Sequence, residues 1–260
     1  HKKLLFEILN LIKKKKLKIF LRNSFIQNIF FIHNRLFIYF ELKELKNDQN
    51  WNVWKRLIKD SPIGHPIWYF LYPKSTGNRI RQVYIIKKFL DLNPTVKLKK
   101  INKIIEIGGG YGCMADIFLK INKKINYTIY DMYEVNLLQY YYLKMNNHHP
   151  RLNSNKNNIN LINKLSDLKK IKNNSLTIAN WSLSEFPLRF RHKFINTIKN
   201  SKYTIISFQK NFENIDNYNF FIKQIRRLGS KYLTKIDTFD HYNKSFLNTN
   251  KHYILTIFKK

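Results

Sequence analysis

A run of glycines between residues 106 and 112 gives the clearest sign of chemistry in this sequence. There the chain reads Glu106-Ile107-Gly108-Gly109-Gly110-Tyr111-Gly112, after a short β-branched run and before a helical pattern. Glycines at a strand-to-helix turn let the backbone come close to a ligand and point its amide groups at it. The turn therefore predicts a binding site for a nucleotide-like cofactor.

The spacing of these glycines selects among cofactor types. The dinucleotide fingerprint G-x-G-x-x-G would need glycine at 113, where Cys113 stands, whereas E-x-G-x-G-x-G fits and is typical of methyltransferases. Asp131 ends the next expected strand, where an acidic side chain can accept hydrogen bonds from both ribose hydroxyls. We therefore expect S-adenosylmethionine as the cofactor. Its expected binding residues are Glu106, Gly108, Gly109, Gly110, Gly112 and Asp131.

The elements that must position this turn alternate along the chain from residue 101 on. Short β-branched runs alternate with segments of helical period, which predicts βαβ units and a parallel sheet with helices on both faces. Two late strands, 232–239 and 252–260, have no helical pattern between them and should pair antiparallel at the sheet edge. The expected fold class is α/β, a Rossmann-like, mostly parallel seven-stranded sheet with an antiparallel C-terminal hairpin. The other expected strands are 103–107, 127–131, 159–163, 175–181 and 203–208, and the expected helices are 111–122, 134–145, 187–199 and 215–228.

Residues 1–100 are expected to form a helical extension and a lid on the acceptor side, and residues 101–260 the cofactor-binding domain. Segment 2–22 places apolar residues at helical spacing before a run of four lysines. Such a helix either covers the main domain or lies on an anionic membrane surface. Segment 61–73 is rich in proline, glycine and aromatic residues, which predicts a loop, and helix 78–92 follows it.

Charge and composition narrow the class of protein. The 48 Lys and Arg residues against 16 Asp and Glu give a formal net charge of +32, a field that attracts polyanions. The excess is mainly lysine, however, and nucleic-acid readers depend on arginine for bidentate contacts, so nucleic acid is not the expected partner. A single cysteine excludes a disulfide framework and is typical of the cytoplasm. We expect a cytoplasmic protein, with peripheral contact to the inner membrane left open.

Three stretches carry a resemblance to a known family: IIEIGGGYGCMADIFLK, YTIYDMYEVNLLQYYYLKMN and ANWSLSEFP. They resemble the sugar O-methyltransferases, bacterial enzymes of the class I methyltransferase fold linked to surface-polysaccharide gene clusters, over about residues 60 to 210. The resemblance implies that the glycine turn holds the methionine part of the cofactor and that Asp131 holds the ribose. It also implies that the Ser182 to Pro187 motif follows the fourth strand. SPIGHP resembles an upstream stretch of the family, but with His65 in place of an expected asparagine.

A sugar hydroxyl is a weak nucleophile, so a general base is expected near the carboxyl ends of the strands. Among the few acidic residues and histidines expected near these strand ends, Glu185 and His241 are the catalytic candidates. Glu185 could instead cap a helix, and His241 could instead sit in the hairpin turn. Asp167, after the third strand, is expected at the adenine amine, and Asn180 is also expected to bind the cofactor. The expected substrate-binding residues are His65, Tyr72, Ser182, Gln209 and Asn211.

Two other classes of function remain open from the sequence. An RNA methyltransferase would explain the charge, but the fourth strand ends in Asn180-Trp181-Ser182-Leu183 and lacks the Pro-Pro-aromatic turn that grips an exocyclic amine in many base methylators. A non-enzymatic module that binds a glycan or a membrane would not need an intact cofactor turn. The spacing of His and Asp does not indicate a particular set of metal ligands, so a divalent metal stays unassigned. The sugar, its nucleotide or lipid carrier and the oligomeric state also stay open.

Overall fold

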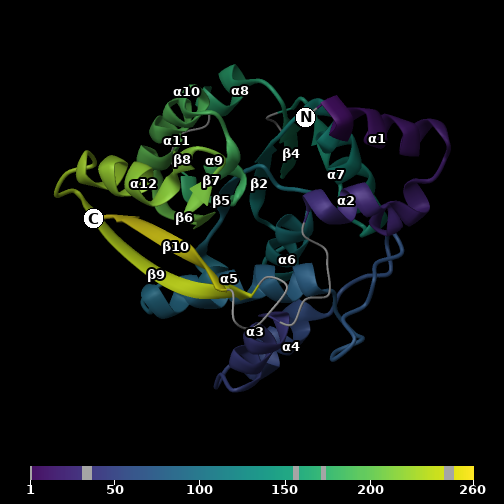
Figure 1. Ribbon diagram of the computed structural model, residues 1–260, viewed down its shortest axis with the longest axis horizontal. Coiled ribbons are helices and arrows are strands. Elements are labelled where there is room, and N and C mark those ends of the chain that lie inside the picture. Colours follow the sequence, from purple (N-terminus) through teal and green to yellow (C-terminus); the bar gives the residue numbers. More distant parts are fainter. Residues whose placement is uncertain (1, 31–36, 155–157, 171–173, 243–248) are drawn as a thin grey trace.

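The computed structural model describes residues 2–30, 37–154, 158–170, 174–242 and 249–260 (Figure 1). Within them, one eight-stranded sheet has the order β3-β4-β2-β1-β5-β6-β10-β9, and β7 and β8 form a separate two-stranded ribbon. The strands are β1 (Lys103–Ile107), β2 (Asn126–Tyr130), β3 (Arg151–Leu152), β4 (Ile159–Ile162), β5 (Asn174–Asn180), β6 (Ser201–Gln209), β7 (Asn211–Phe212), β8 (Ile215–Asp216), β9 (Tyr232–Tyr242) and β10 (Thr249–Lys259).

The sheet confirms the expected α/β class. The strands from β3 to β6 in the sheet order are parallel, and β10 runs antiparallel between β6 and β9. The C-terminal hairpin is longer than expected, and β3 adds a two-residue edge strand that the sequence pattern did not indicate. Since the carboxyl ends of β1, β2 and β5 meet at one edge, the loops that follow them share one site.

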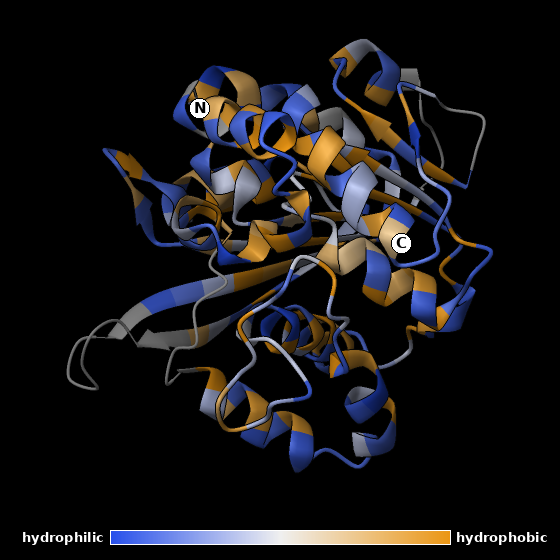
Figure 2. Cartoon of the chain, turned by 90° about the vertical axis from the view of Figure 1, so that its right-hand side faces the viewer, coloured by the Kyte–Doolittle hydropathy of each residue, from blue (hydrophilic) through white to orange (hydrophobic). Residues whose placement is uncertain are grey.

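Helices cover both faces of the sheet (Figure 1). In Figure 2 they alternate between hydrophobic and hydrophilic residues, as elements that bury one face must do. The helices are α1 (Lys2–Lys13), α2 (Ser24–Ile29), α3 (Phe37–Lys46), α4 (Trp51–Ile58), α5 (Gly77–Leu92), α6 (Cys113–Ile121), α7 (Tyr133–Met145), α8 (Leu165–Lys170), α9 (Ser182–Glu185), α10 (Leu188–Arg191), α11 (Ile195–Lys199) and α12 (Asn217–Arg226), with 3₁₀ turns η1 (Leu17–Arg22), η2 (Leu98–Lys100) and η3 (His192–Phe194).

Strand β1 shows how the two cores arise. Ile104 faces the core shared with α1 to α7, whereas Ile105 and Ile107 face the core shared with α8, α9, α11 and α12, because side chains alternate along a strand. The N-terminal helices belong to the first core, in which Leu42 and Trp54 are buried with Ile104. The division at residue 100 therefore stays a prediction, since residues on both sides of it share one core. No helix in the described ranges has the length and apolarity to cross a bilayer.

Two expected helices are interrupted. The helix expected over 2–22 ends at Lys13, because Lys15 adopts a positive φ of 54° and the chain continues as η1. The helix expected over 187–199 is split into α10, η3 and α11. There the Arg191 side chain is buried and donates to the backbone carbonyls of Phe186 and Ser184. These hydrogen bonds hold Arg191 against the residues that precede α10, in place of a continuous helix.

Candidate active site

A cavity of about 330 Å³ lies at the carboxyl ends of β1, β2 and β5, between the glycine turn and α2. This volume falls at the lower end of the range of small-molecule sites, roughly 300–1,000 Å³. The lining combines apolar residues with a few polar groups, as such sites do. Its residues are Phe25, Ile29, Phe30, Asn78, Arg81, Gln82, Glu106, Gly108, Gly109, Gly110, Tyr111, Cys113, Met114, Asp131, Met132, Val135, Asn180, Trp181, Ser182, Glu185, Phe186 and His252.

The glycine turn forms the floor of this cavity. Gly108 has a φ of 71°, and a Cβ added there would overlap the side chain of Ser182, whose hydroxyl donates to the Ile107 carbonyl. Gly110 has a φ of 55° and also lines the cavity, whereas Gly112 lies outside the lining and precedes α6 with a φ of 100°. The sequence therefore places glycine where the backbone turns sharply beside the cavity.

Two carboxyl groups face the cavity, the buried Glu106 on β1 and the half-buried Asp131 directly after β2. The Tyr127 hydroxyl donates to Glu106 Oε2 over 2.8 Å, and burial, with the nearby charge of Asp131, raises the pKa of Glu106 to about 8. Burial likewise raises the pKa of Asp131 to about 7, although its oxygens accept hydrogen bonds from the Met132 amide and from Gln139 Nε2, each over 2.9 Å. A cationic ligand would lower both pKa values, because it favours the charged carboxylates.

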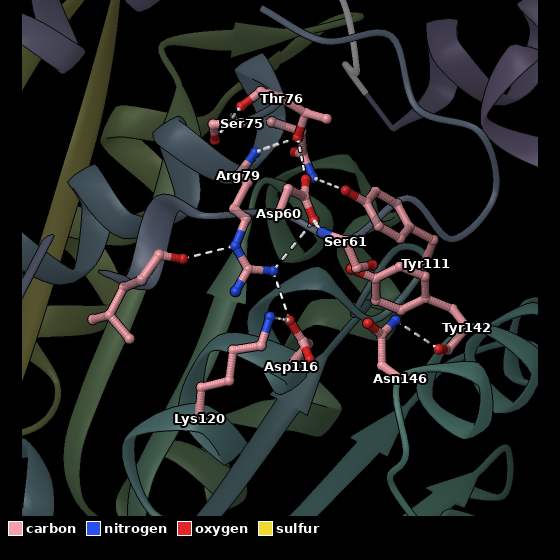
Figure 3. Close-up of polar contacts among 12 residues, drawn as sticks. Asp60, Ser61, Ser75, Thr76, Arg79, Tyr111, Asp116, Lys120, Tyr142 and Asn146 are labelled. Atoms are coloured by element: carbon pink, nitrogen blue, oxygen red, sulfur yellow. Dashed lines mark hydrogen bonds and ion pairs between the residues drawn. The ribbon is translucent and has the colours of Figure 1, made fainter. Parts of the chain in front are cut away.

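A buried ion network between α5 and α6 lies near Tyr111 of the glycine turn (Figure 3). Arg79 on α5 donates to Asp116 on α6 over 2.6 Å, and both side chains are fully buried. Lys120 and His148 also contact Asp116, at 2.9 and 2.8 Å. One residue before Arg79, the Asn78 amide donates to the hydroxyl of Tyr111 within the turn over 3.0 Å. Helix α5 therefore anchors the turn as well as lining the cavity.

The opposite wall comes from the end of β5. Asn180 Nδ2 donates to Gln82 Oε1 over 3.0 Å, and the Ser207 hydroxyl donates to Asn180 Oδ1 over 3.0 Å, so the amide orientation is held from both sides. The next residue, Trp181, has a positive φ of 59°, and its indole N–H donates to His252 Nδ1 over 2.8 Å. That bond leaves the ring proton of a neutral His252 on Nε2.

Arg81 completes this wall and is held by the N-terminal extension. Its guanidinium lies 2.5 Å from a Glu41 carboxylate oxygen and over the rings of Trp181 and Phe239, at 5.4 and 5.6 Å from the ring centroids. Both members of the ion pair are nearly buried. Helix α3, which carries Glu41, therefore positions a cavity residue although it does not itself reach the cavity.

Glu185 lies at the end of the short helix α9 and lines the cavity. Burial raises the pKa of Glu185 to about 7, against the opposing effects of a hydrogen bond with Gln209 and the charge of Arg191. Gln209 itself accepts a hydrogen bond from the Ser184 hydroxyl over 3.2 Å. A carboxyl group with such a pKa can exchange a proton near neutral pH.

Several expected site residues lie away from the cavity. His65 is exposed, and its carbonyl accepts a hydrogen bond from Arg22, while Tyr72 packs edge-on against Trp51. The 61–73 loop contributes no lining residue, and the part of the N-terminal extension before it lines the cavity through α2 and Phe30.

Three further expected residues also lie outside the lining. Asn211 is exposed and belongs to the β7–β8 ribbon, and Asp167 lies in α8. The backbone of His241 pairs with Asn250 in the C-terminal hairpin, and its side chain lies outside the described part of the chain. The roles expected for these residues stay predictions, as does the substrate role of Gln209, which reaches the site through Glu185.

Sequence reasoning missed Phe30, Gln82, Trp181 and His252 among the lining residues. Trp181 carried a local signal, since it directly follows Asn180 at a strand end. His252 opens the last apolar run, opposite Gln209 in the antiparallel register, so correct pairing of the hairpin would have placed it at the carboxyl edge. Gln82 lies on α5 and Phe30 directly follows α2, and the approach of both helices to the cavity depends on tertiary packing.

The topology decides the fold. The glycine turn follows a central strand, parallel strands extend on both sides of it, and an antiparallel strand is inserted beside β6. The chain has the class I methyltransferase fold. No protein-family model matches the chain, and no curated protein is similar to it in sequence.

Solved structures similar to this chain include several methyltransferases. The methyltransferase domain of a bacterial Hen1 is 13% identical with a TM-score of 0.49, over 69% of this chain and 97% of that chain. Precorrin-6y C5,15-methyltransferase from Geobacter metallireducens is 11% identical with a TM-score of 0.44, over 63% and 84% of the two chains. An O-methyltransferase family protein from Burkholderia thailandensis is 11% identical with a TM-score of 0.43, over 70% and 60%. These likenesses concern the fold alone.

S-adenosylmethionine, the cofactor of class I methyltransferases, fits the residues present. Glycines line the floor where a Cβ at Gly108 would overlap the Ser182 side chain, and the half-buried Asp131 has carboxylate oxygens that could accept hydrogen bonds from ribose hydroxyls. Glu106 adds a buried carboxyl group that complements a cation. Within the described residues no three His, Cys, Asp or Glu side chains gather closely enough to share a metal ion, and metal dependence stays unassigned.

Proposed function

We propose that this protein is an S-adenosylmethionine-dependent O-methyltransferase that acts on a sugar hydroxyl, in the biosynthesis of a surface polysaccharide or another glycan. The observation that carries the proposal is the position of Glu185. Its carboxyl group lines the cofactor cavity with a pKa raised to about 7 by burial. General bases work best with a pKa near the working pH, and a neutral sugar hydroxyl needs one.

The walls around Glu185 suit a sugar ring. Trp181 and Phe186 offer aromatic faces, while Asn180 and His252 offer polar groups. Sugars present apolar C–H faces and a rim of hydroxyls, which match such a combination. The hydrogen bonds that Asn180 makes to Gln82 and Ser207 hold its amide in one orientation, which reduces the entropy lost when a substrate is ordered.

This arrangement assigns a separate role to each group of residues in the proposed reaction. When bound, the sulfonium of S-adenosylmethionine supplies an activated methyl group for in-line displacement. Asp131 and the glycine turn orient the cofactor, and the wall from Asn180 to Ser182 orients the acceptor hydroxyl. Glu185 takes the hydroxyl proton and passes it to solvent afterwards. Positioning of donor and acceptor accounts for most of the acceleration in such a reaction.

The cavity does not favour a nucleic-acid substrate. Among its described lining residues, Arg81 is the one Lys or Arg side chain, and its guanidinium is already engaged by Glu41. A phosphate backbone requires several basic side chains along its path. The sugar proposal therefore rests on the cavity itself and not on the net charge of the chain.

The test is mass spectrometry of acceptors incubated with the purified protein and S-adenosylmethionine. Nucleotide sugars and glycans extracted from the source cells would be compared, and a gain of one methyl group on a sugar hydroxyl is the expected result. Glu185→Gln should lower turnover about 10²–10⁴-fold and leave cofactor affinity unchanged. Glu213→Gln, an exposed carboxyl outside the cavity, serves as the matched control. Methylation at the wild-type rate by Glu185→Gln would exclude Glu185 as the base, and methylation of RNA instead of sugars would overturn the substrate class.

A further inference from the structure

Helix α1 has two faces of different character. Ile8 and Leu11 are buried against the domain, whereas Phe6 is 62% exposed and Leu9 is 40% exposed. At about 100° per residue, Phe6, Leu9 and Lys13 fall within about 60° of one another on the helix surface. We call Lys3, Phe6, Leu9 and Lys13 the outer face of α1. Phe6 is the most exposed large hydrophobic residue in the described chain.

This outer face is strongly basic. Lys3 and Lys13 are exposed, and exposed Lys14, Lys15 and Lys16 follow at the end of the helix. Residues 1–30 contain eight Lys and Arg residues and one acidic residue, Glu7. None of the exposed lysines is paired with a carboxylate in the part of the chain that the structure describes.

The outer face is joined to the wall of the cavity. Lys3 Nζ lies 5.2 Å from the ring centroid of Phe25, which lines the cavity from α2. Asn23, which caps α2, donates to the Glu7 carboxylate of α1 over 3.4 Å. Figure 1 shows α1 and α2 together at one side of the molecule, beside α7. Whatever binds α1 therefore lies next to α2 and the cofactor cavity.

We propose that the outer face of α1, with the lysines that follow it, docks onto an anionic membrane surface. An apolar stripe flanked by lysines is the arrangement with which interfacial helices bind bilayers, since the apolar side chains enter the acyl boundary and the lysines attract anionic headgroups. A nucleic acid would use the lysines alone and leave Phe6 and Leu9 in water. The exposed apolar pair therefore favours a lipid surface over a nucleic acid.

The proposal depends on α1 and not on methyl transfer, so the two can fail separately. Co-sedimentation would compare vesicles of phosphatidylcholine alone with vesicles in which about a quarter of the lipid is phosphatidylglycerol, at physiological salt. We expect binding to the anionic vesicles only. The double variant Phe6→Ser/Leu9→Ser should weaken that binding at least tenfold, because burial of one such side chain is worth more than a factor of ten.

A second variant tests the charge. Lys13→Gln/Lys14→Gln should weaken binding about 25-fold, since each lysine near an anionic surface contributes about a factor of five. Matched controls are Phe70→Ser, which removes a side chain that is 59% exposed, and Lys99→Gln/Lys100→Gln, which removes two exposed lysines before β1. Neither control should change vesicle binding, and all variants should bind S-adenosylmethionine as the wild type does.

Three results would overturn the proposal. The first is equal binding to both kinds of vesicle, or to neither. The second is RNA binding at the same salt that the lysine variant weakens and the Phe6→Ser/Leu9→Ser variant does not. The third is a dimer in sedimentation velocity that Phe6→Ser/Leu9→Ser dissociates, because a second copy of the chain would then cover the outer face of α1.

Discussion

Replacement of Glu106 by glutamine should make the cofactor-free protein more stable and its cofactor affinity lower. Glu106 is buried, and its pKa is raised to about 8 from an unfolded value of about 4.3. The folded protein therefore holds this proton more tightly than the unfolded chain does. Its stability falls as pH rises from the unfolded pKa to about 8, where the buried carboxyl ionises. The neutral amide of the Glu106→Gln variant would avoid that loss and could still accept the Tyr127 hydrogen bond.

The same pKa values set the size of the effect on binding. A cofactor that requires one ionised carboxyl group gains affinity with pH until that group is fully charged. Between about pH 6 and pH 7.5 the gain is about eightfold for a pKa near 7, as at Asp131, and about 25-fold for a pKa near 8, as at Glu106. This range stays below the pH at which the cofactor's own amino group loses its proton.

Isothermal titration calorimetry with S-adenosylmethionine across this pH range, in buffers of different ionisation enthalpy, measures both affinity and proton release. The wild type should release protons on binding, and Glu106→Gln should bind more weakly and release fewer. Thermal unfolding at about pH 8.5 should show Glu106→Gln melting above the wild type in the absence of cofactor. A pH-independent affinity in the wild type, or a destabilised Glu106→Gln protein at that pH, would refute the reasoning.

Two further changes test the architecture around the site. Gly108→Ala should cost about 1–3 kcal/mol more than Gly229→Ala in urea unfolding, because both glycines have positive φ but only the first would meet a side chain, and equal costs would remove the steric argument. Asp116→Asn should cost about 3–5 kcal/mol by leaving the buried Arg79 partly uncompensated, whereas Asp91→Asn at a partly exposed ion pair should stay within about 1 kcal/mol. Burial alone would raise the pKa of Asp116, but His148, Arg79 and Lys120 outweigh it, so the pKa is lowered. The stability that this carboxylate contributes should therefore be lost as pH falls through the acidic range. A wild-type free energy of unfolding that does not change with pH in that range would contradict this prediction.

Local patterns in the sequence were sufficient for the sheet and the cofactor turn. β1, β2, β5 and β6 coincide with the expected β-branched runs to within two residues, because buried parallel strands are short and continuously apolar. The glycine turn and Asp131 were predicted from residue type at strand ends, and both line the cavity, while their cofactor roles stay predictions. The interruption at Arg191 was not visible, because its carbonyl partners are identified only in the folded chain.

The acceptor side of the cavity was beyond sequence reasoning for the same reason. Phe30 and Arg81 belong to segments more than 20 residues before β1, and their places depend on how the N-terminal helices pack on the sheet. Tyr72 in the 61–73 loop was expected to bind the substrate, but its ring packs against Trp51. An aromatic residue packs against another as readily as against a ligand, and only the fold distinguishes the two.

The most direct test of the central claim is a crystal structure of the protein with S-adenosylhomocysteine, the product that the proposed reaction leaves behind. The account predicts ligand in the cavity between the glycine turn and α2, with the Asp131 carboxylate within hydrogen-bond distance of both ribose hydroxyls. It also predicts that the side that would carry the methyl group faces Glu185. Ligand bound elsewhere, or an empty cavity at saturating ligand, would contradict the account.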